Sequence, residues 1–549
     1  MEAFDYVIVG AGSAGCVLAN RLSEDSGSTV CVLEAGPPDW NPYIHIPAGF
    51  IKTFYDRSIN WCYDMEPSEG TAGRSVYAPR GKTLGGSSAI NGHVYNRGQR
   101  TDFDTWAQFG NRGWGFSDVL PYFKRIETRI GGGDDRFAGR QGPFKVTYSP
   151  WTHPLCEAFM DGCEQLGIPR NRDYNGEIQE GVSYTHRAIY RGRRMSAARA
   201  FLHPVKKRSN LAIRTRAHVM NLMFEGKRCT GVRYRKGGRS GDVVEIRANR
   251  EVILSGGAFN SPQLLKLSGI GTPQELKGHG IDVRHALIGV GENLRDHYAP
   301  RFACRVKGVE TINERVHGLR LVAETMKWLS GQPSILSIPP TVVYAFWHSG
   351  ITSGSSDLQI TFTPATYKEG VQGQLETEPG FTVAVWQQRP ESKGFVRLRS
   401  SDPFEAPIIQ PNYLAEEIDR RVLLAGMKLA RRLMHTDPLK PYVAAESFPG
   451  PSVQTDDELM DAGRARGTTT FHPMGTCRMG PSSDPLAVVD DRLRVHGVAG
   501  LRIIDASIMP TMLSANLNAA TLMIADKGSD MIRGREPLEA ETSVLAAAE

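Results

Sequence analysis

The sequence lacks the features that mark membrane-spanning, secreted and metal-binding proteins. Its 549 residues contain no window of about 18 uninterrupted apolar residues, so we expect no transmembrane segment. Strand-like residues begin almost at Met1 with no basic stretch before them, so we expect no secretory signal peptide. The eight cysteines form no C-x-x-C pair, which favours a reducing, cytoplasmic location and gives no metal motif, but leaves a zinc site or a disulfide open.

A strong excess of one charge is also missing. The chain has 65 Lys and Arg against 59 Asp and Glu, a net charge of +6, spread without a basic block. This balance predicts a solvated, slightly basic surface and no nucleic-acid partner. The hydrophobic content of 40% is enough for the core of a large two-part enzyme or of two to four domains.

The strongest local pattern is at the start of the chain. Residues 6–9 form an apolar, β-branched run typical of a buried strand, and a helix is predicted over 14–22. Between them lies a G-x-G-x-x-G sequence, in which Gly10 allows a tight turn, Gly12 lets backbone approach a pyrophosphate and Gly15 lets the helix pack on the strand. The helix N-terminus then offers N–H groups to the phosphates.

A second predicted strand, 29–33, ends at Glu34, near the spacing of an acid that holds a ribose hydroxyl. The whole pattern predicts an adenine-dinucleotide site. It does not separate FAD from NAD, although an acid at this position disfavours the 2′-phosphate of NADP.

Later segments predict two further layers. Strands at 211–213, 219–224, 231–234 and 251–255 indicate an antiparallel layer that rejoins the first sheet, and Arg502–Ile504 is a strand that ends at Asp505. Because the first and last segments are both needed for one sheet, the dinucleotide domain should be discontinuous. Strands at 358–362, 381–386 and 395–398 accompany a basic, amphipathic helix over 419–434, which either packs on a sheet or contacts a membrane surface peripherally.

Four more motifs follow in order: GKTLGGSSAINGHVYNRG at 81–98, GAFNSPQLLKLSGIG at 257–271, GVGENLRDH at 289–297, and HPMGTCRMG at 472–480 with DASIMP at 505–510. With the first motif they resemble the glucose–methanol–choline (GMC) oxidoreductase family over about 1–535, in particular its bacterial choline-dehydrogenase-like and FAD-dependent alcohol dehydrogenases. The resemblance implies an α/β fold with a Rossmann-like FAD-binding domain and a substrate domain on a mainly antiparallel sheet of about six strands.

On this basis we predict an FAD-binding domain in three parts (1–153, 211–298 and 465–535), a substrate domain in two parts (154–210 and 299–464) and a flexible tail (536–549).

The resemblance also implies catalytic residues. His472 is the expected base for the hydroxyl proton, a task that suits imidazole because its unperturbed pKa is near 6.5. Asn516, 44 residues further on, is expected to hold the substrate oxygen, with Asn518 as the alternative. Phe471 and Trp386 are expected in the substrate pocket, unless Trp386 is simply a core residue.

The implied FAD contacts come from every motif. Some family members attach FAD covalently to a histidine after the GGSS turn; the corresponding residue here is Ile90, so FAD is expected to be non-covalent. The predicted contacts are Gly10, Gly12, Ser13, Ala14, Gly15, Glu34, Ala35, Gly85, Ser88, Asn91, Gly92, the backbone of Val219, Asp505, Ala506 and Asn516.

The implied reaction is oxidation of a primary alcohol to an aldehyde, with the hydride passing to the flavin, the proton to His472, and the electrons to a quinone or another acceptor. Aromatic and apolar lining favours a neutral alcohol over a sugar, and no acid for the cation of choline is identifiable. The main alternative is an oxidase of the same fold, which uses oxygen and releases hydrogen peroxide. A lyase, a photodecarboxylase and a non-catalytic flavin protein are more remote alternatives, the last disfavoured by the intact pair of His472 and Asn516.

Overall fold

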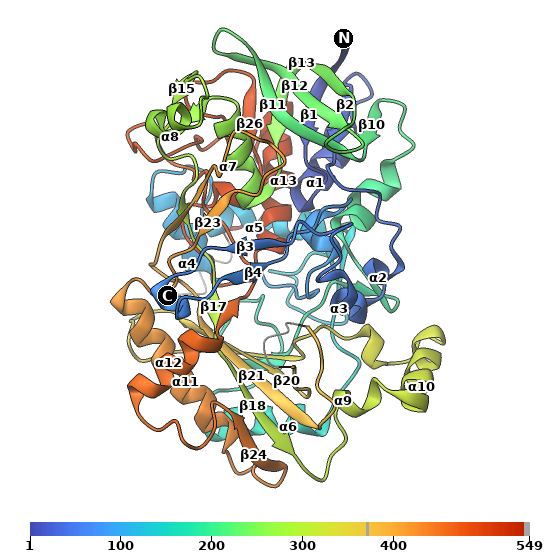
Figure 1. Cartoon of the computed structure of the whole chain (residues 1–549). Coiled ribbons are helices and arrows are strands. Elements are labelled where there is room, and N and C mark those ends of the chain that lie inside the picture. The colour runs from blue at the N-terminus through green and yellow to red at the C-terminus, as the bar shows by residue number, and fades with distance from the viewer. Residues whose placement is uncertain (369–372, 543–549) are drawn as a thin grey trace.

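The computed structural model describes residues 1–368 and 373–542, and its two largest sheets lie at opposite ends of the molecule (Figure 1). The first sheet has seven strands in the order β10-β2-β1-β13-β12-β11, with β26 beside β13. Its strands are β1 (Glu2–Val9), β2 (Val30–Leu33), β10 (Leu211–Arg214), β11 (Ala217–Glu225), β12 (Arg228–Lys236), β13 (Val243–Leu254) and β26 (Leu501–Ile503).

The first sheet is parallel at its centre. Strands β10, β2, β1, β13 and β26 pair in parallel, whereas β11, β12 and β13 pair antiparallel, so the predicted antiparallel layer is continuous with the main sheet. The parallel strands β1, β2, β13 and β26 end one or two residues before Gly10, Glu34, Ser255 and Asp505, respectively. These four residues therefore lie along one edge, where open α/β sheets bind their ligands.

Helix α1 (Ser13–Leu22) packs between this sheet and helix α13 (Asn518–Arg533), which runs through the middle of the molecule (Figure 1). A methyl group on Gly15 would meet the carbonyl oxygen of Gly10 at 1.9 Å, so no larger residue fits at this crossing. The close contact of helix and strand predicted for the third glycine of the motif is therefore present.

The second sheet has six strands, all paired antiparallel, in the order β24-β18-β21-β20-β19-β7. They are β7 (Gly181–Tyr184), β18 (Arg301–Val306), β19 (Val343–Trp347), β20 (Leu358–Thr363), β21 (Gly380–Gln387) and β24 (Val443–Phe448). This confirms the α/β fold with a six-stranded antiparallel sheet that the family resemblance implied.

Helix α11 (Glu417–Met434) covers one face of the second sheet. A methyl group on its Gly426 would lie 2.8 Å from the side chains of Leu358 and Val385, and its large apolar residues are buried or partly buried. Arg431 of this helix pairs with Glu446 of β24. Helix α11 therefore presents no exposed apolar face for the peripheral membrane contact considered for 419–434, because that face packs on the sheet.

The remaining elements are short. The longer helices among them are α4 (Arg100–Gln108), α5 (Phe116–Ile126), α6 (Pro154–Gln165), α7 (Gly257–Leu267), α10 (Gly318–Leu329) and α12 (Asp456–Arg466). The others are α2 (Pro42–His45), α3 (Phe50–Thr53), α8 (Pro273–Gly278), α9 (Ile312–Arg315), β3 (Tyr63–Met65), β4 (Val76–Ala78), β5 (Glu127–Ile130), β6 (Phe144–Thr147), β8 (Ile189–Tyr190), β9 (Arg193–Arg194), β14 (Ile270–Gly271), β15 (His285–Ala286), β16 (Glu292–Leu294), β17 (Tyr298–Ala299), β22 (Gly394–Arg397), β23 (Ile408–Gln410) and β25 (Thr468–Thr469).

The end of the chain contacts the body of the protein. The backbone N–H of Leu538 donates to the hydroxyl of Tyr122, and Lys124 pairs with Glu541 at 2.7 Å. Residues 536–542 therefore contact helix α5, whereas the rest of the predicted flexible tail lies outside the described residues.

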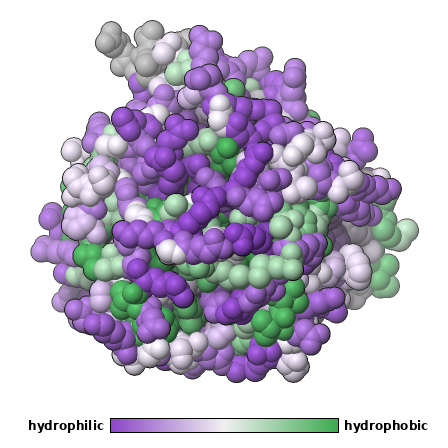
Figure 2. Space-filling view, turned by 90° about the horizontal axis from the view of Figure 1, so that it is seen from above, coloured by the Kyte–Doolittle hydropathy of each residue, from purple (hydrophilic) through white to green (hydrophobic). Residues whose placement is uncertain are grey.

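The surface seen from above is mainly hydrophilic, with small separate hydrophobic groups (Figure 2). Within 1–368 and 373–542, no helix has the length and apolar character required to cross a bilayer.

Candidate active site

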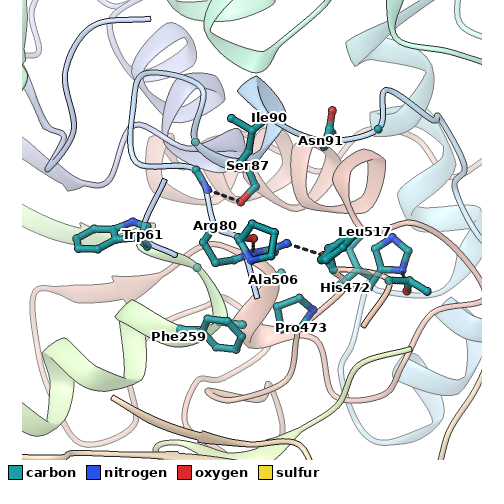
Figure 3. A pocket seen from close by; sticks show the side chains of 18 of the residues that line it. Trp61, Arg80, Ser87, Ile90, Asn91, Phe259, His472, Pro473, Ala506 and Leu517 are labelled. Carbon is teal, nitrogen blue, oxygen red and sulfur yellow. Dashed lines mark hydrogen bonds between the residues drawn. The ribbon is translucent and has the colours of Figure 1, made fainter. Parts of the chain in front are cut away.

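A cavity of about 760 Å³ lies between the two sheets and is lined by residues from both. In Figure 3, Ser87 and Asn91 lie on one side of this cavity and Phe259 and Pro473 on the other, with His472 between the two sides. The cavity thus joins the ligand edge of the first sheet to the face of the second sheet that α11 leaves uncovered.

The glycine-rich turn forms one end of the cavity. Gly10 has a φ of +100°, and a methyl group on Gly12 would be 3.9 Å from the nearest protein atom. The space over Gly12 is therefore free in the protein itself, as close approach of a pyrophosphate requires. Gly10, Gly12, Ser13, Ala14, Ala35, Val219 and Ala506 all line this end, whereas Gly15 is turned toward the helix–strand contact.

Glu34 is buried at the same end, and each of its carboxylate oxygens accepts one backbone N–H, from Ala11 and from Gly36, both at 2.9 Å. Burial raises the pKa of Glu34 to about 7. Since each carboxylate oxygen can accept two hydrogen bonds, both retain a lone pair for a ribose hydroxyl.

Asp505 lines the cavity, but its carboxylate already has three donors. One oxygen accepts from the Gly257 N–H at 2.8 Å and the Ser261 hydroxyl at 2.6 Å, and the other from the Ser507 N–H at 2.8 Å. Asp505 thus fixes the start of α7 and caps the 3₁₀ turn 506–508.

The GGSS turn divides the predicted contacts into two groups. Asn91 and Gly92 line the cavity, together with Gly86, Ser87 and Ile90, which had not been named as contacts. Gly85 and Ser88 do not line it: the Ser88 hydroxyl donates to the Gly85 carbonyl at 2.5 Å and accepts the Ala197 N–H at 2.9 Å. These two residues therefore stabilise the turn through hydrogen bonds on the side away from the cavity.

The predicted catalytic pair lies at the other end of the dinucleotide site. The Asn516 Nδ2 atom is 2.9 Å from His472 Nε2, and the hydroxyl of Tyr344 is 3.3 Å from Asn516 Oδ1. Asn518, the alternative to Asn516, instead accepts from the Ser13 hydroxyl at 2.8 Å, away from His472.

The proton positions around His472 follow from its partners. His297 Nε2 lies 2.7 Å from the Gln388 carbonyl oxygen, which can only accept a hydrogen bond, so the proton of neutral His297 is on Nε2. The Nδ1 atom of His297 is then unprotonated and can only accept. The facing Nδ1 of His472, 2.9 Å away, must then donate. This leaves His472 Nε2 as the unprotonated nitrogen, which faces the Asn516 amide.

Burial keeps His472 in this neutral form. The pKa of His472 lies well below its usual value because the ring is desolvated and because His297 and the Arg80 guanidinium disfavour a second positive charge. Arg80 donates to the carbonyl of Phe471 at 2.8 Å, next to the histidine. The result is an imidazole whose Nε2 is unprotonated at neutral pH.

Asp296 holds the backbone that carries His472. One carboxylate oxygen accepts the backbone N–H groups of His297 at 2.9 Å and His472 at 2.8 Å, and the other accepts from Tyr413 and Thr469. Asp296 is buried, so its carboxyl group and these four donors lock segment 469–472 in place.

The predicted pocket aromatics both line the cavity. The Phe471 ring contacts that of Phe54 edge-on at 5.4 Å, and the Trp386 ring lies 6.1 Å from that of His297. Trp386 belongs to β21, on the cavity side of the second sheet, so it faces the same space as Tyr344.

Sequence reasoning missed three residues around this pair. His297 and Asp296 end the GVGENLRDH motif, whose polar last residues were a usable signal, but no role was assigned to them. Tyr344 lies in a hydrophobic strand without any motif, and only the antiparallel pairing of β19 brings it to Asn516.

Comparisons with known proteins agree over almost the whole chain. Family models described as GMC oxidoreductase match residues 4–299 and 390–525. An oxygen-dependent choline dehydrogenase of Staphylococcus aureus (strain JH9) is 41% identical over 543 residues, 98% of this chain and 95% of the relative.

Solved structures show the same fold. Pyridoxine 4-oxidase from Mesorbium loti is 31% identical with a TM-score of 0.86, covering 97% of this chain and 100% of that chain. A variant of formate oxidase from Aspergillus oryzae RIB40, studied for its FAD modification, is 28% identical with a TM-score of 0.89, covering 97% and 98%.

Proposed function

Because the chain belongs to the GMC oxidoreductase family, we propose that it is an FAD-dependent enzyme that oxidises a primary alcohol to an aldehyde. The observation that carries this proposal is the unprotonated Nε2 of His472, which faces Asn516 at the wall of a cavity that extends from a dinucleotide-type turn. A base and an amide placed together suit the removal of a proton from a hydroxyl group.

The cavity fits a non-covalent FAD. The free space over Gly12 and the lone pairs of Glu34 suit the pyrophosphate and a ribose, and Ser87, Ile90 and Asn91 lie beyond them along the wall. Ile90 has no nucleophilic atom for a covalent bond to the cofactor. When bound, FAD supplies the acceptor for the hydride of the alcohol carbon.

The protein's own part is to hold the alcohol and take its proton. We assign His472 Nε2 as the proton acceptor and the Asn516 amide as the group that orients the hydroxyl oxygen. The Tyr344 hydroxyl donates to Asn516 Oδ1, which directs the Asn516 NH₂ group toward His472. A positioned base of this kind typically contributes ~10²–10⁴ in rate.

For the electron acceptor we propose a quinone or another organic acceptor, with oxygen as the second candidate. The names of the Staphylococcus relative and of the two oxidases above support oxygen, because each is described as an oxygen-dependent enzyme or an oxidase. We also propose a cytoplasmic location, which the eight free cysteines support.

We further propose the three-part and two-part domain division predicted above. It is supported by the sheets, since the strands of the first sheet come from within 1–153, 211–298 and 465–535, and those of the second from within 154–210 and 299–464.

Anaerobic mixing of the purified yellow protein with aliphatic, aryl, furan and polyol alcohols and with choline tests the function. We expect loss of flavin absorbance with at least one class, and no loss in His472→Asn. Admission of air then distinguishes an oxidase, whose colour returns rapidly, from a dehydrogenase. Absence of bleaching with every alcohol would refute alcohol oxidation and favour the lyase or photodecarboxylase alternatives.

A further inference from the structure

Strand β18 of the second sheet places a cation on the cavity wall. Its side chains alternate: Phe302 and Cys304 are fully buried in the core of the substrate half, whereas Arg301 and Ala303 line the cavity. This alternation follows from the two-residue period of a strand. Arg301 therefore points away from the packed side of the sheet and into the space between the two sheets.

The sheet register relates Arg301 to the catalytic pair. Arg301 pairs with Ala384, which pairs with Thr361, which pairs with Tyr344, so the four lie in one row across the cavity face. With neighbouring strands about 4.8 Å apart, Arg301 and Tyr344 are separated by roughly 14 Å along this row. Tyr344 contacts Asn516, so an extended molecule with its hydroxyl at His472 can reach Arg301 with its other end.

No partner neutralises Arg301 in the part of the chain that the structure describes: no ion pair and no side-chain hydrogen bond is formed by its guanidinium there. Within 1–368 and 373–542 its only electrostatic contact is with the phenol of Tyr367, and burial lowers the pKa of Arg301. Arg305, two residues further along the same strand, pairs with Glu376 and, at 3.1 Å, with Glu378. Because an uncompensated guanidinium in a partly dry cavity is costly, an anionic ligand would stabilise Arg301.

The other charged residues that line the cavity beside the second sheet also carry positive charge. Among the described residues, the acids that line the cavity are Glu34 and Asp505, both at the dinucleotide end. Lys368 and Arg80 line the cavity together with Arg301. Within the described ranges, a quaternary ammonium alcohol would thus find no carboxylate beside the second sheet, although the curated relatives are named for choline.

We propose that the substrate is an alcohol with a carboxylate at its far end, an ω-hydroxy carboxylate, whose anionic group binds Arg301 while its hydroxyl is oxidised at His472. This inference rests on the proposed alcohol oxidation and adds the substrate class. The planar guanidinium fork matches a carboxylate in two parallel hydrogen bonds. The Trp386 side chain, two residues from Ala384 on the same face of β21, offers apolar surface to the carbon chain between the two ends.

The reaction balances without another reactant. The C–H and O–H bonds of the terminal CH₂OH group break, the hydride passes to the FAD, the proton passes to His472 Nε2, and a C=O double bond forms. The product is an ω-oxo carboxylate, and the carboxylate at Arg301 is unchanged.

The test compares three alcohols of equal chain length on the holoenzyme: ω-hydroxyhexanoate, hexanol and the corresponding ω-trimethylammonium alcohol, followed by a series of longer ω-hydroxy carboxylates. We expect the carboxylate to have the highest kcat/KM and the ammonium alcohol the lowest. In Arg301→Met the ratio of kcat/KM for carboxylate to hexanol should fall by at least about 30-fold, the loss typical of a broken buried charge pair. Arg301→Lys should retain part of the preference, and Arg301→Glu should reverse it.

Arg305→Met is the matched control, because it removes a cation from the same strand whose charge is already paired; its substrate ratio should equal that of the wild type. Binding of hexanoate, which has no hydroxyl, to the holoenzyme by calorimetry gives a second readout, and should be lost in Arg301→Met. Oxidation of hexanol with no preference for the carboxylate in the wild type would overturn the inference while leaving alcohol oxidation intact. Absence of flavin bleaching with all three alcohols and the wider panel would refute the proposed function itself.

Discussion

The Nδ1 atoms of His297 and His472 lie 2.9 Å apart, and only one of them can carry a proton. The Gln388 carbonyl decides which, because it requires the proton of His297 on Nε2. A directed chain of donors therefore runs from the Tyr344 hydroxyl through Asn516, and a second runs from His472 through His297 to Gln388. Both leave His472 Nε2 as the acceptor that faces the cavity.

Replacement of His297 should impair the base without removing it. In His297→Phe the His472 Nδ1–H loses its acceptor on His297 and keeps only Thr470, at 2.8 Å. We expect kcat/KM to fall by about 10- to 100-fold, less than loss of the base itself, which is ~10²–10⁴. The acidic limb of the kcat/KM–pH profile should also move to higher pH, because His297 helps to lower the pKa of His472. The exposed His435 offers the control His435→Asn, and an unshifted profile in His297→Phe would contradict the assignment.

Removal of the base should separate cofactor binding from catalysis. We expect His472→Ala to keep the flavin spectrum and lose alcohol oxidation by ~10²–10⁴. Rapid anaerobic flavin reduction measures this loss directly. Turnover close to that of the wild type would exclude His472 as the proton acceptor.

Two alanine variants of the first motif should fail in different ways. In Gly12→Ala the new methyl group meets no protein atom closer than 3.9 Å, so the fold should remain and the FAD content should fall. In Gly15→Ala the methyl group would meet the Gly10 carbonyl at 1.9 Å, so the protein itself should be destabilised. FAD occupancy and thermal unfolding of the apoprotein distinguish the two; full FAD occupancy in Gly12→Ala would show that the pyrophosphate does not pass over this residue.

The cofactor should leave the protein on denaturation. Ile90 cannot form a covalent bond to the flavin, and the nearby His93 is buried with its Nε2 donating to the Pro47 carbonyl at 2.9 Å. Acid precipitation should therefore release all yellow colour into the supernatant. Flavin fluorescence retained on the denatured polypeptide in a gel would contradict this prediction.

Acid should destabilise the fold through its buried histidines. Burial lowers the pKa of His186, His218 and His297 from 6.5 to about 4. Below pH 6.5 the unfolded chain binds protons that the folded chain does not, so the free energy of unfolding falls as the pH drops toward 4. Glu34, whose pKa is raised to about 7, has the opposite effect: its contribution lowers the free energy of unfolding as the pH rises toward 7. The midpoint of thermal unfolding, measured from pH 7 to pH 4, should decrease; a constant midpoint would show that these rings are hydrated.

Much of the first sheet, and the proximity of His472 and Asn516, could be predicted from the sequence, because the signals are local or belong to complete motifs. The strand at 6–9, the glycine turn and the helix after it follow from a few adjacent residues, and His472 stands in an extended motif. The family membership and the six-stranded antiparallel sheet implied by these motifs are confirmed.

Other features depended on partners far away in the sequence. The amphipathic pattern of 419–434 fitted both a membrane surface and a sheet, and only the packing of Gly426 on β20 and β21 decided between them. In the GGSS turn, the sequence did not reveal which residues face the cavity, because this depends on the hydrogen bond between Ser88 and Ala197.

The sequence by itself determined the class of cofactor site and singled out His472 as the proposed base, because a turn, a strand end and a motif histidine are set by neighbouring residues. The tertiary structure alone decided the tautomer of His472 and the placement of the Arg301 cation on the cavity wall. His297 contacts His472 from 175 residues away, and Gln388 contacts His297 from 91 residues away. Arg301 reaches the cavity because the register of β18 with β21 places its side chain on that face, and sequence periodicity does not specify which partner strand a residue meets.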